Sequence, residues 1–333
     1  MTIARRSAVS VAAVWALVLA SALVLTGCTT VPIDTGASAS AANAVLKSGP
    51  TVAKLPTADI VPVAPGLVPG PRADRIIALD RNGTLGSIVF ALGLGPHVVG
   101  RDRSTTFPSA AQLPYVTERG HAINAERVLA QNPSIVLLTE DATPAGAVDQ
   151  LRAAGITVAV FTGKRSIAGN SALITDVAKA LEVPDAGRKL VQRTEKQVAD
   201  ARKQVPDPSG DPTIGFLYIR GEHLILLAGP GSGADDLITA LGGTDAGTKA
   251  GLDAAFTQVS AESMIRANPE VLLVMTQGAE SVGGLDEVLK IPAIADTDAG
   301  RNGRVVAMDE TQILMFGPDT GLVLSALATS IYA

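Results

Sequence analysis

Residues 123–138 read INAERVLAQNPSIVLL, and residues 259–274 read VSAESMIRANPEVLLV. In each stretch, a short amphipathic helix ends at Asn-Pro and a buried strand of Ile, Leu and Val follows. The two stretches align without a gap, so that Glu126 falls on Glu262 and Asn132 on Asn268. A repeated helix–strand unit predicts two structurally related lobes, and the cleft between such lobes is where a ligand is expected.

Strands and helices alternate on both sides of the first stretch, at the spacing of α/β units. A long helix is predicted to follow the first lobe, because apolar or small residues recur there every three or four positions. Prolines and a glycine end this helix, and a strand over 213–218 opens the second lobe. The predicted parts are an N-terminal α/β lobe (73–184), an interlobe helix (185–206) and a C-terminal α/β lobe (207–333).

The N-terminus carries two arginines, an apolar run over 8–25 and then Leu25-Thr26-Gly27-Cys28. This pattern predicts a secretory signal over 1–27. The small-small-Cys ending resembles the lipobox of bacterial lipoproteins, in which the cysteine, here Cys28, is fatty-acylated. A simple membrane anchor around a buried cysteine is the alternative. Residues 28–72 are rich in Ser, Thr, Ala, Gly and Pro, a composition that predicts a flexible tether.

Composition excludes several classes of protein. The 333 residues are 47% hydrophobic and 18% charged, with a net charge of −5, so neither general disorder nor a broad basic surface for nucleic acid is expected. A single cysteine closes no intrachain disulfide and builds no cysteine-rich zinc site. No Gly-x-Ser-x-Gly elbow and no His-Glu-x-x-His helix is present, so we expect no catalytic residues.

Taken together, the repeat, the long helix and the lipobox resemble the class III substrate-binding lipoproteins of ABC-type importers. That family carries vitamin B12, ferric siderophores or haem, and its fold has two α/β lobes joined by one long rigid helix. Within the family, the chain is most similar to the haem-binding lipoproteins of actinobacterial importers. The likeness is carried by Gly120-His121, by 216–221 (FLYIRG) with 231–235 (GSGAD), and by 275–284 (MTQGAESVGG).

This resemblance implies a haem site between the lobes. A histidine from one lobe and a tyrosine from the other ligate the iron in that subfamily, with an arginine two positions after the tyrosine. By position, these residues are His121, Tyr218 and Arg220.

The chemistry of these side chains suits ferric haem, since imidazole and phenolate are both established axial ligands. A phenol ionises near pH ~10, so a nearby cation helps it to ligate. Arg220 lies two positions from Tyr218 and so points to the same side of the strand, where it can stabilise the phenolate. The alternatives remain a loop histidine at 121, a core tyrosine at 218 and a surface ion pair for Arg220.

The pattern gives weaker evidence for three further site residues, Met275, His223 and Tyr115. Met275 ends a predicted strand and can support the ligand or belong to the core. His223 is a second ligand or an exposed loop residue, and Tyr115 is expected at the rim of the pocket. His97 follows Gly-Pro in a turn and is expected to be structural.

Glu126 and Glu262 occupy equivalent first-turn positions in the repeat, where the helix dipole favours a carboxylate. In the family, one exposed glutamate of each lobe binds arginines of the permease, and the repeat places these two residues there. Surface acids that only complement the dipole are the alternative.

The loop 229–233 (GPGSG) lacks the spacing of a nucleotide-binding motif. We interpret it as a tight turn into a helix from Ala234, whose free N–H groups are available to a haem propionate.

The sequence therefore predicts a haem-binding protein that is not an enzyme, tethered through Cys28 to the extracellular face of the cytoplasmic membrane. Its expected partners are haem, an ABC permease with its ATPase and upstream surface haem-binding proteins, and it is expected to be monomeric. The same fold with a siderophore or cobalamin is the main alternative. A lipid-anchored haem- or metal-dependent enzyme and a surface adhesion module are the others.

Overall fold

The structure is a computed structural model that describes residues 46–206 and 210–333. The expected signal segment, Cys28 and the first part of the expected tether lie outside the described residues. Among the helices of these two ranges, none is both long enough and apolar enough to cross a membrane.

The N-terminal lobe is built around a parallel sheet of four strands in the order β3-β2-β4-β5. Its central strands β2 and β4 are fully buried, which explains their continuous runs of Ile, Val and Leu. The lobe's elements are β2 (Ile76–Leu79), α2 (Thr84–Leu92), the 3₁₀ turn Gly95–His97, β3 (Val98–Arg101), the 3₁₀ turn Pro108–Ala110, α3 (Ala125–Ala130), β4 (Ile135–Thr139), α4 (Ala145–Ala153), β5 (Thr157–Phe161) and α5 (Asn170–Ala180).

The C-terminal lobe is built around a seven-stranded sheet in the order β1-β11-β10-β6-β7-β9, with β8 paired to β6. β1, β11, β10 and β6 are parallel, whereas β7 and β9 are antiparallel to their neighbours. The elements are β6 (Thr213–Arg220), β7 (Leu224–Ala228), α7 (Ala234–Ala240), β8 (Thr244–Asp245), α8 (Ala246–Lys249), β9 (Phe256–Gln258), α9 (Ala261–Ala267), β10 (Val271–Met275), α10 (Thr276–Glu280), α11 (Leu285–Lys290), α12 (Pro292–Ala295), α13 (Asp298–Asn302), β11 (Val305–Met308), α14 (Glu310–Ile313) and α15 (Thr320–Ile331).

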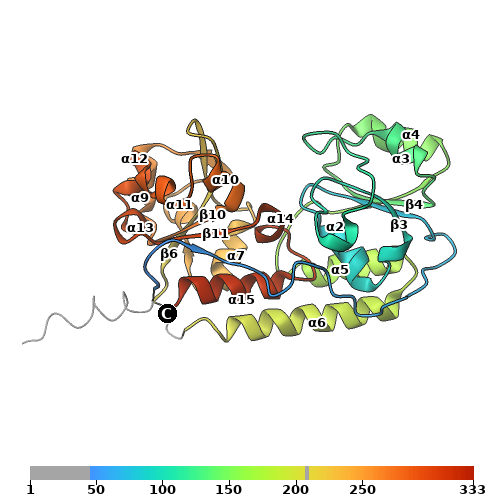
Figure 1. Ribbon diagram of the computed structural model, residues 1–333, viewed down its shortest axis with the longest axis horizontal. Coiled ribbons are helices and arrows are strands. Elements are labelled where there is room, and N and C mark those ends of the chain that lie inside the picture. The colour runs from blue at the N-terminus through green and yellow to red at the C-terminus, as the bar shows by residue number, and fades with distance from the viewer. Residues whose placement is uncertain (1–45, 207–209) are drawn as a thin grey trace, which may run out of the picture. The chain divides into compact units, whose positions relative to one another are not determined.

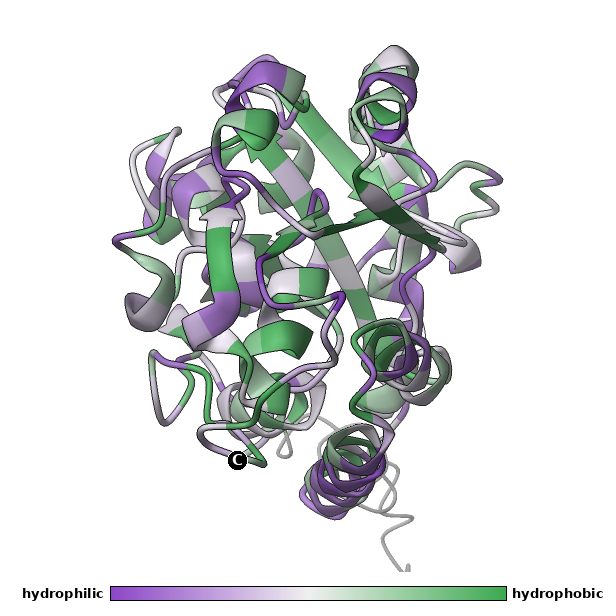
Figure 2. Cartoon of the chain, turned by 90° about the vertical axis from the view of Figure 1, so that its right-hand side faces the viewer, coloured by the Kyte–Doolittle hydropathy of each residue, from purple (hydrophilic) through white to green (hydrophobic). Residues whose placement is uncertain are grey.

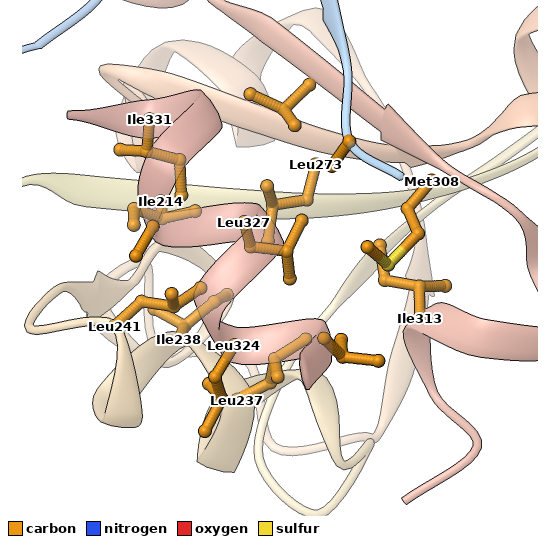
Figure 3. Close-up of a cluster of buried hydrophobic side chains, with 14 of the residues drawn as sticks. Ile214, Leu237, Ile238, Leu241, Leu273, Met308, Ile313, Leu324, Leu327 and Ile331 are labelled. Carbon is orange, nitrogen blue, oxygen red and sulfur yellow. The ribbon is translucent and has the colours of Figure 1, made fainter. Parts of the chain in front are cut away.

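Helices cover the sheets and enclose the hydrophobic cores. In the C-terminal lobe, α7 and α15 pack on one face of the sheet through Leu237, Ile238, Leu324 and Leu327, against Leu273 and its neighbours (Figure 3). The hydrophobic residues gather on the strands in the interior (Figure 2). Each lobe therefore has a rigid sheet from whose strand ends functional side chains can project.

The long helix α6 (Pro184–Arg202) packs against α5 of the N-terminal lobe and α15 of the C-terminal lobe (Figure 1). Its predicted stripe is buried: Leu190, Thr194, Val198 and Ala201 are each at most 7% exposed. The helix ends at Arg202, before the expected boundary at 206, and hydrogen-bonded turns continue to Val205. The predicted arrangement of two α/β lobes with one long helix between them is therefore confirmed.

The repeat is confirmed in three dimensions. α3 and α9 begin at aligned positions of the two stretches, and so do β4 and β10. The side chains of Asn124 and Ser260 cap the two helices at equivalent positions. The Asn of each Asn-Pro pair, Asn132 and Asn268, has positive φ (49° and 35°), a conformation that asparagine tolerates and that turns the chain into the strand.

One prediction about the N-terminal segment is wrong over residues 46–72. β1 (Thr51–Val52) pairs with β11, and Ala53 N donates to Ala307 O at 2.8 Å. Further along, Ser109 donates to Asp59, and Val63 N donates to Ala91 O. We call residues 46–72 the strap, because they contact both lobes (Figure 1, blue). Composition missed this because the strap gains its order from backbone pairing with β11, a contact distant in sequence.

Candidate ligand site

The carboxyl ends of the parallel strands of the two sheets face each other. The loop after β2 meets the loop after α14: Asn82 Nδ2 donates to Leu314 O at 2.9 Å, and Thr84 Oγ1 donates to Met315 O. Beside them, Thr106 Oγ1 donates to Thr311 Oγ1 at 3.1 Å. Ligands of parallel α/β sheets bind outside the carboxyl ends of the strands. The facing edges are therefore the candidate ligand site.

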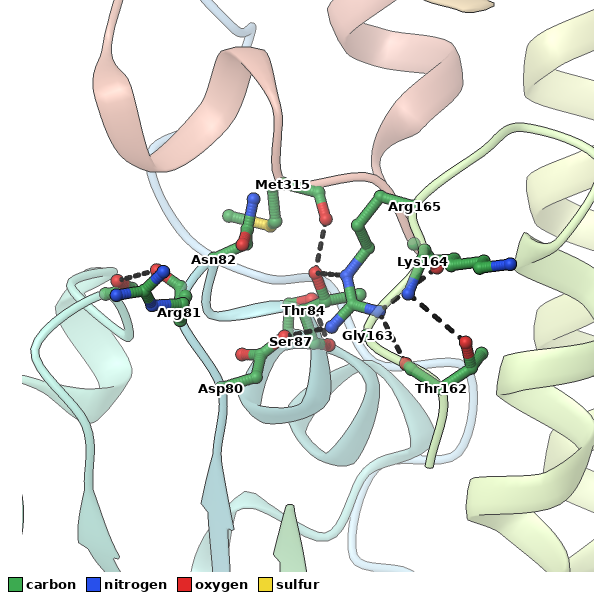
Figure 4. A network of polar contacts seen from close by, with 12 residues as sticks. Asp80, Arg81, Asn82, Thr84, Ser87, Thr162, Gly163, Lys164, Arg165 and Met315 are labelled. Carbon is green, nitrogen blue, oxygen red and sulfur yellow. Dashed lines mark hydrogen bonds and ion pairs between the residues drawn. The ribbon is translucent and has the colours of Figure 1, made fainter. Parts of the chain in front are cut away.

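A buried ion pair supports this junction from the N-terminal lobe (Figure 4). Arg165 donates to Asp80 at 2.5 Å and to Thr84 Oγ1 at 3.1 Å, so that Thr84 links the pair to the other lobe through Met315 O. Burial raises the pKa of Asp80, although Arg165 opposes the shift. Burial and the neighbouring Asp80 raise the pKa of Asp102 to about 7.

His121 lies at the tip of a turn at the carboxyl edge of the N-terminal sheet. Its φ is 68°, and its N–H donates to Glu118 O at 3.2 Å. It lines a small cavity of about 20 Å³ together with Asp80 and Arg81, which follow β2. Burial, and then the charge of Arg81, lowers its pKa. A neutral imidazole at this edge keeps a nitrogen lone pair that can bind a metal.

Tyr218 and Arg220 lie at the carboxyl end of β6, where Tyr218 is partly exposed and Arg220 is exposed. The guanidinium carbon of Arg220 is 4.6 Å from the centre of the Tyr218 ring, and the Phe256 ring meets that ring edge-on at 6.3 Å. Arg220 Nη1 also donates to Ile219 O at 2.9 Å. The structure thus brings Tyr218 and Arg220 together in the way that their spacing predicts, with a cation beside the phenol.

Glu310 is a residue of this site that sequence reasoning missed. Its carboxylate is 3.9 Å from Arg220 Nη1, and its side chain is 12% exposed. Burial raises the pKa of this carboxyl. Glu310 follows the end of β11, so the rule that ligand sites lie at strand ends could have found it.

Two arginines on the other lobe were also missed. Arg81 follows β2 and Arg103 follows β3, and the charges of both contribute to the lowered pKa of His121. Tyr115, the expected rim residue, is 37% exposed, and its ring lies under Arg101 and Arg103 at 4.2 and 4.6 Å. The N-terminal edge of the site therefore carries exposed positive charge, which suits the carboxylates of an anionic ligand.

The other candidate residues, Met275, His223 and His97, lie in three different environments. Met275 is 6% exposed and belongs to the core of the C-terminal lobe, which supports the core alternative for this residue. His223 is exposed in the turn between β6 and β7. His97 lies in a 3₁₀ turn with its ring 3.2 Å from Asp74 O, in agreement with a structural role.

The loop before α7 forms the tight turn that the sequence predicts, and α7 begins at Ala234. Gly231 and Gly233 have positive φ, as a tight turn requires. Their N–H groups donate to the carboxylate of Asp235 at 2.7 and 3.0 Å, and Ala234 N donates to Ser232 Oγ. These three N–H groups, of which only Ala234 N belongs to α7, are therefore occupied by side chains of the same segment. A propionate at the following N–H groups of α7 stays a prediction.

The glutamates of the repeat are exposed in the first turns of α3 and α9. Glu262 pairs with Arg266 at 2.9 Å, whereas Glu126 has no ion pair within the described ranges. A separate cavity of about 270 Å³ lies between the strap, Phe107 and the segment from Asp309 to Val323, and none of the predicted site residues lines it.

Comparisons with known proteins identify the family of this chain and several relatives. The family model described as "Periplasmic binding protein" matches residues 78–311. The uncharacterized ABC transporter substrate-binding lipoprotein YvrC of Bacillus subtilis is 24% identical over 78% of this chain and 80% of its own length. The vitamin B12-binding protein of Vibrio campbellii is 23% identical over 63% of this chain and 74% of its own.

Two haem-binding proteins are similar in structure. The crystal structure of the heme-binding protein HmuT is 32% identical, with a TM-score of 0.78 over 86% of this chain and 98% of that one. The periplasmic heme-binding protein RhuT of Roseiflexus sp. RS-1 is 38% identical, with a TM-score of 0.71 over 78% and 97%. Three variants of HmuT replace an arginine, a tyrosine and a histidine by alanine, and that arginine follows that tyrosine by two positions.

Proposed function

This chain belongs to the periplasmic binding protein family, and from this membership we propose that it binds haem for an ABC-type importer. Substrate-binding proteins of this kind deliver their ligand to a permease that an ATPase drives. The similarity to HmuT and RhuT, whose names state haem binding, supports haem as the ligand.

The observation that carries the proposal is the pair of candidate ligands at facing sheet edges. A half-buried histidine of lowered pKa, His121, lies at the N-terminal edge, and Tyr218 with Arg220 beside its ring lies at the C-terminal edge. Imidazole and phenolate can approach the two faces of a flat iron porphyrin from opposite lobes. The guanidinium carbon of Arg220 lies 4.6 Å from the centre of the Tyr218 ring, so a cation is present beside this candidate ligand.

The test is a titration of haemin into the chain that begins at residue 29, followed by absorption. The unsubstituted protein should bind saturably. Tyr218→Phe should lose the phenolate-to-iron charge-transfer band, and His121→Ala should alter the Soret band. Loss of a residue that only supports an iron ligand typically lowers affinity by about 10–100-fold. Loss of the ligand itself should have a larger effect, so each substitution should lower the affinity for haem by more than about 100-fold.

Arg220→Gln should weaken haem binding by about 10-fold while the charge-transfer band persists, because this residue supports the ligand and does not replace it. His97→Ala is the matched control, since this histidine lies in a turn away from the site. Unaltered spectra for both Tyr218→Phe and His121→Ala would refute the proposed ligation, and failure to saturate would refute haem binding.

Cobalamin binding by the same fold is a second candidate, which the named function of the Vibrio relative favours. Titration with cobalamin under the same conditions separates the two ligands. Saturable binding of cobalamin, together with no saturable binding of haemin, would favour cobalamin as the ligand.

We further propose that Cys28 anchors the protein to the outer face of the membrane. The lipobox-like sequence and the name of the Bacillus relative as a lipoprotein support this. Labelling with radioactive palmitate should mark the unsubstituted chain and not Cys28→Ala, which should leave the membrane fraction. Equal labelling of both chains would contradict lipidation at this residue.

Docking on the permease is assigned to Glu126 and Glu262. Their equivalent, exposed positions on both lobes support this assignment, because charges at the rim of an interface set orientation and encounter rate. Replacing both by Gln should leave haem binding unchanged and abolish stimulation of the importer's ATPase.

A further inference from the structure

Two exposed aliphatic side chains occupy equivalent positions in the internal repeat. Leu129 is 37% exposed and Ile265 is 60% exposed, and the alignment of the two stretches pairs one with the other. The large hydrophobic residues left exposed within the described ranges are Val52, Val61, Val68, Tyr115, Leu129, Val160, Leu224 and Ile265. No other two residues of this set are paired by the repeat, so the coincidence points to a common role of Leu129 and Ile265.

Each aliphatic residue shares a helix face with a glutamate. Leu129 follows Glu126 by three positions on α3, and Ile265 follows Glu262 by three on α9, a spacing that makes side chains neighbours on a helix. Val128 and Met264 anchor the opposite faces and are fully buried. The fold thus needs neither Leu129 nor Ile265 for its core, and presents them beside a carboxylate on both lobes.

We propose that Leu129 and Ile265 are the apolar anchors of the surface that binds the importer's permease, with one anchor per lobe. This inference rests on the proposed function, which supplies the partner. A surface repeated on two related lobes fits a partner with two equivalent receptor sites, as in a two-fold symmetric dimer. Each receptor should offer an apolar pocket beside a cation, since the surface pairs an aliphatic side chain with an acid. The acids disfavour an anionic lipid surface as the occupant.

The two halves of this surface differ in charge. Arg266 pairs with Glu262, whereas Ala130 occupies the equivalent position beside Glu126. Glu262 must therefore leave Arg266 before it pairs with a cation of the partner, which reduces its net contribution to the free energy of binding. The greater exposure of Ile265 compensates, because more apolar area is available for burial. Ile265 should consequently be the stronger anchor.

The experiment measures binding of the haem-loaded protein to the permease–ATPase complex of its importer in lipid nanodiscs. Ile265→Ala should weaken binding to the complex by about 10-fold and Leu129→Ala by about 3-fold. Losses of affinity of this size are expected when alanine replaces an interface residue that contributes to binding. The double variant should lose about 30-fold, because the sites lie on separate lobes. Val160→Ala is the matched control: this residue is 44% exposed on β5, outside the repeat, and its loss should change binding less than about 2-fold.

Haem affinity and thermal stability of all variants should equal those of the unsubstituted protein. The inference is overturned, and the proposed function stands, if the double variant binds the complex normally while Glu126→Gln with Glu262→Gln does not bind. Absence of binding by the unsubstituted, haem-loaded protein overturns the proposed function and the inference with it.

Discussion

At the scale of single residues, the most unusual group is a carboxylate buried behind the junction of the lobes. Asp102 is 1% exposed and accepts hydrogen bonds from the N–H groups of Asp80, Ser104 and Thr105, at 2.7 to 3.0 Å. These bonds hold the loop after β3, yet burial and the charge of Asp80 still raise its pKa to about 7. Desolvation therefore outweighs the hydrogen bonds.

This shift predicts a loss of stability with rising pH. A carboxyl whose pKa is higher in the folded protein than in the unfolded chain favours folding while it is protonated. Its contribution falls as pH rises from about 4 toward 7. Between pH 5 and pH 8, the free energy of unfolding of the unsubstituted protein should fall by on the order of 2 kcal/mol relative to that of Asp102→Asn. Urea denaturation of both proteins at the two pH values tests this, and parallel pH dependences would contradict it.

At the scale of elements, close helix contacts fix the interlobe helix. A Cβ at Gly321 of α15 would lie 2.4 to 2.6 Å from backbone atoms of Gln197 and Val198 on α6. Near the N-terminal end of α6, a Cβ at Gly187 would lie 2.5 Å from Ala178 Cβ of α5. Glycine lets both lobes approach the same helix, and this close packing explains why α6 can hold them rigidly.

Gly321→Ala should destabilise the protein by about 2 kcal/mol, although alanine is the better helix former by about 1 kcal/mol, because the clash is with backbone that cannot rotate away. Gly146→Ala on α4 is the matched control: nothing lies within 4 Å of the added Cβ, so it should stabilise by up to about 1 kcal/mol. Thermal unfolding of both variants measures the difference. An increase in Tm for Gly321→Ala would contradict the contact.

At the scale of the whole molecule, several contacts among the described residues join the lobes, including those of α6, of the junction at the facing sheet edges and of the strap. The strap adds β1 to the C-terminal sheet and donates Val63 N to Ala91 O of the N-terminal lobe, while Arg193 of α6 donates to Val61 O. A segment fixed at these points restrains opening of the lobes as well as stabilising each one.

A chain that begins at residue 73 should therefore unfold at a lower urea concentration than one that begins at residue 46. The shortened chain exposes an edge of the C-terminal sheet and the apolar surface that Leu46 and Ala53 cover. At about 25 cal/mol per Å² of apolar surface, this should lower the free energy of unfolding by several kcal/mol. Denaturation curves of the two chains provide the measurement. Coincident curves would mean that the strap contributes nothing to the folded state.

Local patterns in the sequence were enough to predict several features. The aligned stretches predicted two related lobes, and the spacing of apolar residues predicted α6. The strand predicted over 213–218 lies within β6, which runs from Thr213 to Arg220. The two-residue spacing of Tyr218 and Arg220 predicted that their side chains meet, which the distance of 4.6 Å confirms. These contacts arise within one element, where periodicity fixes which side chains share a face.

The features that join distant segments became visible only in the folded chain. The strap has no periodicity of its own and is ordered by β11, a strand near the opposite end of the chain. Glu310, Arg81 and Arg103 belong to the candidate site because strands from different parts of the chain end at facing edges. Asp235 folds back onto the N–H groups of Gly231 and Gly233 in the loop before α7, a contact that the glycine-rich sequence of this loop does not reveal. Such contacts depend on how the chain packs, which the pattern of a single segment does not contain.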